Sequence, residues 1–289
     1  MDNRPIGIFD SGLGGLTAVK EILSILPQED IVYFGDTGRV PYGTRSKETI
    51  MKYAKQDMAF LQSKNVKMII AACGTVSSVA GHIGEALSLP FTGVLKPTAL
   101  AACLATHKKR IGIIGTTATI KSGSYQKAIL EINPDIQVFA QDCPLFVPLV
   151  ENGFTSPDSD IVLSVIKHYL QPFMDADIDT LILGCTHYPI LYHAIEKVMG
   201  KGVFLVDSGK ETAVHAADIL EEQGLLTNRS RKGTCTFYVS DSTDGFTESA
   251  NIFLQQNVEQ TVEFIDIEAF PESAARQVGY LAAGHPHPR

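Results

Sequence analysis

The sequence predicts an α/β protein with two pseudo-symmetric lobes, each built on a mostly parallel sheet, that face a shared cleft. Apolar runs typical of buried strands alternate with stretches of helical spacing, which favours parallel sheets covered by helices. The order of these runs repeats in the second half, and one run in each half ends in a cysteine, Cys73 or Cys185. In open α/β sheets, ligands bind at the edge formed by the carboxyl ends of the strands, which is where these two cysteines are expected.

The first half of the chain predicts strands and helices in alternation. Residues 6–9 form an apolar run that predicts the first strand, and residues 31–34 predict the second. A helix is expected over residues 46–61, and the run 68–72 leads directly to Cys73. The helix between the first two strands has its apolar positions at Leu16, Val19, Leu23 and Leu26. This order predicts parallel strands joined by helical crossovers.

The second half repeats this pattern and then extends it. The resembling pairs are residues 110–115 with residues 5–10 and residues 135–140 with residues 30–35. A third apolar run again ends in a cysteine, and residues 203–206 and 234–239 predict two further strands. The similarity indicates two related lobes, although parallel strands in general look alike.

The repeat also predicts a division of the chain. We expect residues 1–96 and 208–289 to form the first lobe and residues 97–207 to form the second. The last residues, 284–289, are expected to be a flexible tail. If the carboxyl ends of the strands in the two lobes face each other, they enclose a cleft.

Composition and charge exclude several classes of protein. The 289 residues carry a formal net charge of −8, the pI is near 5.5, and no basic block offsets the charge, which argues against a nucleic-acid surface. No apolar run approaches the roughly 18 residues of a membrane span. The five cysteines are scattered without a Cys-x-x-Cys pair, which fits a reducing compartment. We therefore expect a cytoplasmic protein with no nucleic-acid or membrane partner.

Two glycine-rich segments follow predicted strands at the same sheet edge. Residues 10–17 place Asp10 and Ser11 before glycines whose backbone N–H groups suit an anion such as a carboxylate. A dinucleotide fingerprint needs glycine where Thr17 stands, and a phosphate-binding loop needs a Gly-Lys-Ser/Thr ending, so both motifs are excluded. A tight turn that requires glycine is the alternative. Residues 35–44 form a second loop here, either ligand-binding or only structural.

The two cysteines are the strongest candidates for chemistry. Each stands where a strand gives way to a helix, and helix N-termini stabilise thiolates and lower their pKa from about 8.5. His187 is close enough to Cys185 in the sequence to assist proton transfer there. Two thiols at matching positions suggest one reaction that needs an acid and a base on opposite faces of a substrate.

Three other interpretations of the cysteines stay open from the residues alone. A cysteine after a strand is commonly a small buried residue. Structural zinc at Cys185 and His187 would need about four ligands in recognisable spacing, and neither cysteine has a second one nearby. A single Cys/His nucleophile would leave the other cysteine without a role. We therefore predict no metal site and no organic cofactor.

Four segments together carry a specific signature. They are Phe-Asp-Ser-Gly-Leu-Gly-Gly-Leu-Thr at residues 9–17, Gly-Asp-Thr with Arg-Val-Pro-Tyr-Gly-Thr within residues 35–44, Pro-Leu-Phe-Val-Pro-Leu-Val-Glu at residues 144–151, and Leu-Gly-Cys-Thr-His-Tyr-Pro at residues 183–189. From Pro5 to about Gly209, the chain resembles the glutamate racemases of the cofactor-independent aspartate/glutamate racemase family. The resemblance implies a two-lobed fold, interconversion of L- and D-glutamate, and supply of D-glutamate to bacterial peptidoglycan.

The resemblance also implies roles for individual residues. Cys73 and Cys185 would be the two acid/base residues, with Cys73 deprotonating D-glutamate and Cys185 deprotonating L-glutamate. The supporting proton-handling residues that it implies are Asp10, Glu151 and His187. The substrate-binding residues that it implies are Asp10, Ser11, Tyr42, Gly43, Gly74, Thr75, Thr186 and His187. We expect glutamate as the small-molecule substrate, no cofactor, and a homodimer.

The chain departs from the family pattern at three positions. Gly74 stands where the family usually has asparagine, so a substrate contact must come from backbone, water or a neighbour. Gly38 replaces a common alanine, and Lys96 replaces a common glutamate. Two alternatives stay open: a related racemase or decarboxylase acting on another small acidic substrate, and a catalytically silent protein that binds an acidic ligand.

Overall fold

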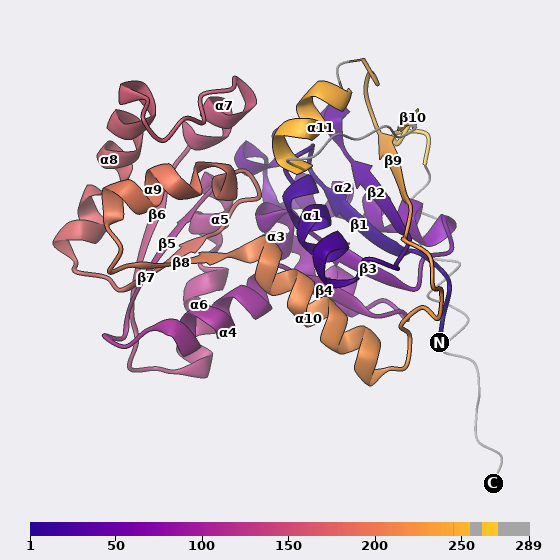
Figure 1. Cartoon of the computed structure of the whole chain (residues 1–289), viewed down its shortest axis with the longest axis horizontal. Coiled ribbons are helices and arrows are strands. Elements are labelled where there is room, and N and C mark those ends of the chain that lie inside the picture. The colour runs from indigo at the N-terminus through magenta and orange to yellow at the C-terminus, as the bar shows by residue number, and fades with distance from the viewer. Residues whose placement is uncertain (245, 255–261, 271–289) are drawn as a thin grey trace, which may run out of the picture.

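The computed structural model describes residues 1–244, 246–254 and 262–270, which contain two sheets side by side (Figure 1). The strands are β1 (Ile6–Asp10), β2 (Ile31–Gly35), β3 (Met68–Ala71), β4 (Phe91–Gly93), β5 (Arg110–Gly115), β6 (Gln137–Asp142), β7 (Thr180–Leu183), β8 (Phe204–Asp207), β9 (Cys235–Val239) and β10 (Val262–Phe264). The α-helices are α1 (Leu16–Ile25), α2 (Lys47–Ser63), α3 (Gly74–Glu85), α4 (Leu95–Ala105), α5 (Thr117–Ser122), α6 (Ser124–Ile132), α7 (Phe146–Glu151), α8 (Asp160–Asp175), α9 (Tyr192–Met199), α10 (Ser208–Glu222) and α11 (Phe246–Leu254). The 3-10 turns are η1 (Thr37–Arg39), η2 (Tyr42–Thr44) and η3 (Tyr188–Leu191).

The internal repeat of the sequence is also a repeat of topology. The first sheet has the strand order β10-β9-β2-β1-β3-β4 and the second has β6-β5-β7-β8, with parallel neighbours throughout the described strands. Matching β1 to β4 with β5 to β8 gives the same order in both sheets. The predicted α/β class with two related lobes and mostly parallel sheets is therefore confirmed.

The chain crosses between the sheets twice. Strands within residues 6–93 and 235–264 form the first sheet, and strands within residues 110–207 form the second. After β8, helix α10 runs back and packs against α1 of the first lobe, as Figure 1 shows. The exact lobe boundaries stay a prediction, and the expected tail at residues 284–289 lies outside the described part of the chain.

Among the element boundaries that differ from the predicted ones by one or two residues, two have a clear local reason. Helix α1 ends at Ile25, one residue before Leu26, because Pro27 disfavours helical backbone at the residue that precedes it. Strand β6 begins at Gln137, two residues later than predicted, because the Asp135 N–H still bonds within the preceding turn. Neither shift moves a residue that lies at the carboxyl edge of a sheet.

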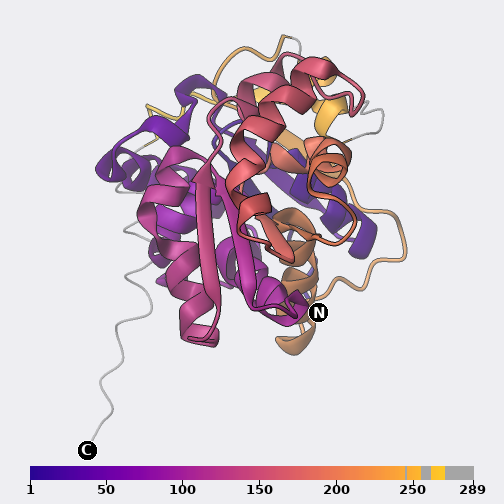
Figure 2. The same ribbon diagram turned by 90° about the vertical axis from the view of Figure 1, so that its left-hand side faces the viewer.

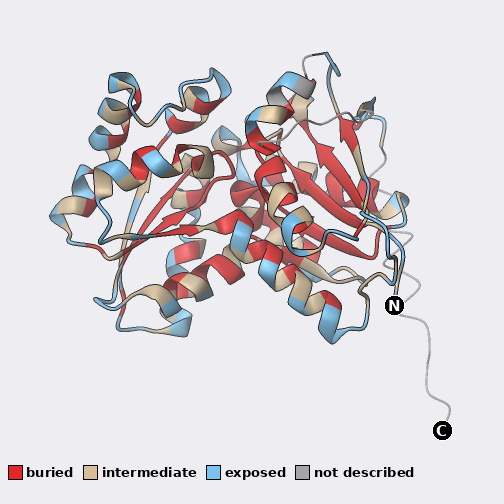
Figure 3. Ribbon diagram, in the orientation of Figure 1, coloured by how far each residue is buried: buried red, intermediate tan, exposed pale blue. Residues whose placement is uncertain are grey.

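Helices cover both faces of each sheet. On the first sheet, α2 and α3 pack on one face and α1, α10 and α11 on the other. On the second, α4 and α6 cover one face and α8 and α9 the other (Figure 2). Strands β3 and β7 are buried along their whole length, as predicted from the apolar runs, and the central strands in Figure 3 are buried too. Polar chemistry is thereby confined to the strand ends.

Candidate active site

A cavity of about 330 Å³ lies between the carboxyl ends of the two sheets. Cys73, which follows β3, and Cys185, which follows β7, both line it, so each lobe contributes one thiol. The other expected site residues that line it are Ser11, Tyr42, Gly43, Gly74, Thr75, Glu151, Thr186 and His187. A larger cavity of about 790 Å³ lies elsewhere, against α3, α4 and α6, and its walls include His82 and His215.

Cys73 occupies the N-cap position of α3 and is almost fully buried. Its Sγ atom lies 3.5 Å from the Ser11 hydroxyl oxygen. Burial, reinforced by the charge of Asp10, raises the pKa of the Cys73 thiol to about 12, and interactions with Ser11 and the Val76 N–H offset only part of this. The first turn of α3 does lower the pKa of Cys73, but the loss of water outweighs it, so the expectation of a net lowering is wrong.

Cys185 lies beside a histidine–glutamate pair. His187 Nδ1 is 3.9 Å from Cys185 Sγ, and His187 Nε2 is 3.0 Å from Glu151 Oε1. Burial alone would lower the pKa of His187, but hydrogen bonds with Cys185 and Glu151, together with the charges of Cys185 and Asp10, raise it to about 10. An imidazolium in this place can pass a proton to the Cys185 sulfur or stabilise negative charge on it.

Asp10 lies behind the cavity wall and does not itself line the cavity. Its carboxyl group is fully buried: Oδ2 accepts a 3.0 Å hydrogen bond from the Gly12 N–H, while Oδ1 has no partner among the described residues. Burial raises the pKa of Asp10, and the charge of His187 opposes this. Because its charge acts on both Cys73 and His187, Asp10 can influence proton handling at both ends of the cavity. Its direct contact with a substrate stays a prediction.

Tyr42 lines the cavity, but its hydroxyl group is used elsewhere. The hydroxyl contacts the carboxyl groups of Asp36 and Asp57, both of which are fully buried. Gly43 follows in the turn η2, where its Cα lies close against Thr116 of the second lobe. The ring of Tyr42 and the backbone of η2 are therefore the parts left to face a ligand.

Several cavity residues were not predicted from the sequence. Thr116 and Thr117 line the cavity from the second lobe, and Thr116 Oγ1 lies 2.9 Å from Thr75 Oγ1 of the first lobe. A signal for them existed, because they directly follow residues 110–115, the counterpart of the strand that ends at Asp10. Cys143 also lines the cavity, and burial raises the pKa of its thiol.

Gly74 lies in close contact with the backbone of the second lobe. A Cβ atom at Gly74 would collide with the carbonyl oxygen of Gly184 and would lie 3.7 Å from the Cα of Cys185. Backbone of the second lobe thus takes the place of the side chain that the resemblance leads one to expect. The two strand-to-helix junctions that carry the thiols therefore touch.

A further residue reaches the histidine from the other lobe. Phe253 of α11 packs edge-to-face on the His187 ring, with centroids 5.2 Å apart and an interplanar angle of 83°. Helix α11 packs against α1, so the first lobe supports a histidine of the second. The sequence holds no signal for this role, because an aromatic side chain at a helical position is typical of ordinary core.

The described residues contain no group of three or more His, Cys, Asp or Glu side chains arranged to hold a metal ion. Within the same part of the chain, no helix has the length and apolar character needed to cross a membrane.

The site can be set beside a known family. The model of the Asp/Glu/hydantoin racemase family matches residues 14–216, which include both Cys73 and Cys185. The chain therefore belongs to the Asp/Glu/hydantoin racemase family, and it is an amino-acid racemase, an isomerase.

The most informative relatives are glutamate racemases. The chain is 46% identical to the glutamate racemase of Geobacter metallireducens over 252 residues, which cover 87% of this chain and 93% of the relative. A crystal structure of the Francisella tularensis glutamate racemase in complex with D-glutamate has a TM-score of 0.87 at 41% identity, covering 93% of this chain and 100% of that one. A Bacillus anthracis glutamate racemase isoform also gives a TM-score of 0.87, at 37% identity, covering 92% of this chain and 98% of that one.

Proposed function

We propose that this protein interconverts L- and D-glutamate by a two-base mechanism and supplies D-glutamate for peptidoglycan synthesis. The observation that carries the proposal is the pair of thiols, Cys73 and Cys185, contributed by opposite lobes to one cavity. Support for glutamate as substrate comes from the relatives that bear the name glutamate racemase and from the D-glutamate in the similar Francisella structure. The peptidoglycan role is the expectation that the family resemblance raises.

In the proposed reaction, a thiolate removes the α-proton of glutamate and the opposite thiol gives a proton to the other face. From L-glutamate, Cys185 takes the proton and Cys73 delivers one; from D-glutamate the roles are exchanged. After conversion of L-glutamate, Cys185 is therefore the protonated thiol and Cys73 the thiolate, and after conversion of D-glutamate the two states are exchanged. His187 with Glu151 handles protons on the Cys185 side, and Ser11 with Asp10 acts on the Cys73 side.

The raised pKa of Cys73 fits one half of this cycle directly. A thiol with a pKa of about 12 holds its proton near neutral pH, so Cys73 is ready as the acid when L-glutamate is bound. Acting as the base requires a positive charge nearby, and the ammonium group of the bound amino acid brings one into the cavity. This makes Cys73 a base only when substrate is present.

The carbanion formed between the thiols needs electrostatic support. The first turn of α3 begins at Gly74, directly after Cys73, and its backbone N–H groups point toward the start of the helix. Such preorganised donors in a site with little water stabilise developing negative charge. We propose that they bind the substrate carboxylate next to the reacting carbon.

Incubation in heavy water tests the two-base mechanism. In a single turnover of L-glutamate, the D-glutamate product should carry deuterium at Cα, because the proton delivered by Cys73 has exchanged with solvent. Unreacted L-glutamate should stay unlabelled at first. A D-glutamate product that keeps the original α-proton would contradict two bases, and faster turnover of aspartate would contradict the substrate assignment only.

Substitution of each thiol gives a second test. Cys73→Ser and Cys185→Ser should each lower racemisation by at least about 1,000-fold, because a hydroxyl is a far weaker base at neutral pH. Circular dichroism of glutamate solutions measures this directly. Cys103→Ser, a half-buried cysteine of α4 outside the cavity, is the matched control and should leave the rate unchanged. Normal racemisation by either cavity variant would overturn the proposal.

We further propose that the protein acts without a metal or organic cofactor, as a cytoplasmic homodimer. Chelation with excess EDTA should leave the racemisation rate unchanged, and the absorption spectrum should show no pyridoxal band. Loss of activity that zinc restores would contradict this. Light scattering after size exclusion should give about twice the mass of 31.3 kDa calculated for the chain.

A further inference from the structure

A buried polar cluster lies behind the wall of the cavity that contains η2. It consists of Asp36, Arg39, Tyr42 and Asp57, which we call the phenol cluster. Asp36 and Asp57 are fully buried, Tyr42 is 1% exposed and Arg39 is 7% exposed. Water is therefore nearly absent, so the polar groups of the phenol cluster must pair with one another or with neighbouring protein groups.

Arg39 and a neighbouring hydroxyl supply most of the donors. Arg39 Nε lies 2.7 Å from Asp36 Oδ2, and Arg39 Nη2 lies 2.9 Å from Asp57 Oδ1. The Ser240 hydroxyl donates to Asp36 Oδ1 at 2.7 Å. Asp36 thus accepts hydrogen bonds from both Arg39 and Ser240, in addition to its contact with Tyr42. Of these two donors, Asp57 accepts only from Arg39.

The Tyr42 hydroxyl contacts two carboxyl oxygens but has only one proton to donate. Its oxygen contacts Asp36 Oδ2 and also lies 3.0 Å from Asp57 Oδ2. A phenol has one proton and can donate it to one carboxylate, so the second contact would set two lone pairs against each other. A proton on one carboxyl group removes this conflict, because the phenol oxygen can then accept as well as donate.

Charge and donors decide which carboxyl group holds the extra proton. Two buried carboxylates beside one guanidinium leave an excess negative charge, which burial makes costly. Asp36 has the fuller set of donors and is therefore the better place for the charge. Burial and the charge of Asp36 raise the pKa of Asp57 well above its ordinary value, while Arg39 opposes this.

Other titratable groups near Asp57 do not reverse this assignment. Asp10 adds a further negative charge that raises the pKa of Asp57. Glu268 faces the far side of Arg39, with its Oε1 3.4 Å from Arg39 Nη1, and is 60% exposed. The Arg39 guanidinium also stacks over the Tyr53 ring at 4.1 Å, which holds it in place.

We propose that Asp57 is a protonated positioning residue, whose carboxyl O–H donates to the Tyr42 oxygen and thereby fixes the η2 wall of the substrate cavity. Tyr42 is the first residue of η2, and Gly43 and Thr44 line the cavity directly after it. Asp57 lies in the middle of α2, a long helix packed on the first sheet. The proposed hydrogen bond thus links the short turn η2 to the long helix α2.

Two substitutions at Asp57 separate a proton donor from a carboxylate. Asp57→Asn places an amide N–H where the carboxyl O–H is proposed, so the KM for glutamate should stay within about twofold of wild type. Asp57→Ala removes the donor and should raise KM about tenfold with a smaller change in kcat. Glu268→Gln, an exposed partner of the same arginine, is the matched control and should change neither. This part of the test rests on the proposed function.

The protonation itself is tested without substrate. Because folded Asp57 keeps a proton that the unfolded chain loses above about pH 4, its contribution to stability falls as pH rises toward its raised pKa. Asp57→Asn has no proton to lose at this position. The difference between its melting temperature and that of wild type should therefore move in favour of the variant as pH rises from about 5 to about 8. Infrared difference spectra at neutral pH should show one protonated carboxyl band in wild type that Asp57→Asn lacks.

Each alternative result overturns a stated part of the proposal. A missing carboxyl band, or a melting difference that shrinks with pH, would show that Asp57 is ionised. An unchanged KM in Asp57→Ala would refute the positioning role while leaving protonation standing. A protein that shows the pH and infrared results but does not racemise glutamate would refute the proposed function and not the proton.

Discussion

At the scale of single residues, the absence of a side chain at Gly74 allows the two thiol-bearing junctions to touch. Gly74→Ala would place a Cβ against the Gly184 carbonyl, which is backbone and cannot rotate away. The expected result is a loss of about 1–3 kcal/mol of stability. A clear fall in kcat/KM is also expected, because Cys185 directly follows Gly184 in the chain and would be displaced with it. Thermal melting and racemisation assays measure the two effects.

The same helix provides a control for this prediction. Gly81 also lies in α3, but a Cβ there would meet open space, so Gly81→Ala should keep activity and stabilise slightly. Gly74→Asn shares the Cβ of alanine and should also lose activity. A Gly74→Asn variant with tighter substrate binding would contradict this expectation.

The site was predictable only where chemistry coincides with a strand end. Cys73 and Cys185 are visible in the sequence because each closes an apolar run, and His187 is visible because it stands beside one of them. Asp57 was not, since a carboxylate within a helix is typical of a solvated face. Its burial follows from the packing of α2 on the sheet, which no local pattern contains.

At the scale of elements, α11 packs against a cavity histidine from outside the cavity. Phe253→Leu removes the ring edge that packs on His187 and should lower kcat/KM about tenfold in both directions, since a loosened histidine misplaces its proton. Equal falls in both directions are required because the equilibrium between the enantiomers is unchanged. Circular dichroism with L- and with D-glutamate measures both rates.

Phe246 gives the matched control on the same helix. It is buried like Phe253 but packs on Phe237 of β9, away from the histidine. Phe246→Leu should cost a similar amount of stability, about 1 kcal/mol, with normal kinetics at a temperature where both variants are folded. Equal kinetic losses in the two variants would show that α11 matters only for folding.

At the scale of the whole molecule, the repeat predicted two lobes but not how they meet. Strand periodicity and the order of runs follow from the sequence, because buried parallel strands must be apolar. The contact between Thr75 and Thr116 and the approach of Gly74 to Gly184 depend on the relative placement of the two sheets. That placement is a property of the tertiary packing, so the cavity and many of its lining residues could be anticipated, whereas the contacts between its two walls could not.

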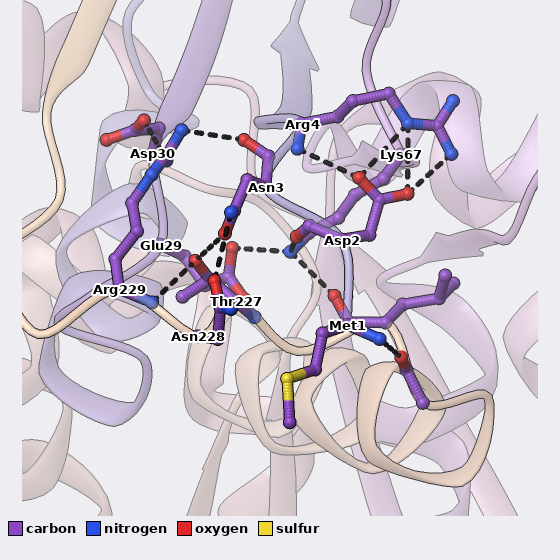
Figure 4. A network of polar contacts seen from close by, with 12 residues as sticks. Met1, Asp2, Asn3, Arg4, Glu29, Asp30, Lys67, Thr227, Asn228 and Arg229 are labelled. Carbon is purple, nitrogen blue, oxygen red and sulfur yellow. Dashed lines mark hydrogen bonds and ion pairs between the residues drawn. The ribbon is translucent and has the colours of Figure 1, made fainter.

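A buried ion pair lies where the chain returns to the first lobe, as Figure 4 shows. Lys67 Nζ lies 2.6 Å from Glu29 Oε2 and donates to the carbonyl oxygens of Asp2 and Leu225 at 2.9 and 2.8 Å. Glu29 Oε1 accepts from the Thr227 N–H at 2.8 Å. The N-terminal segment, the start of β2 and the connection between α10 and β9 are thereby joined at one place.

Replacing the lysine should therefore unfold the protein more easily without changing its chemistry. Lys67→Met leaves the Glu29 carboxylate buried without its cation and should cost about 3–5 kcal/mol in the free energy of unfolding. Denaturant melts measure this cost, and KM for glutamate should stay unchanged because neither residue lines the cavity. The double variant Lys67→Met with Glu29→Gln removes both charges and should recover part of the loss, since an unpaired buried charge costs more than a buried neutral pair. A double variant less stable than Lys67→Met would show that the hydrogen bonds of Glu29, and not its charge balance with Lys67, hold the returning chain.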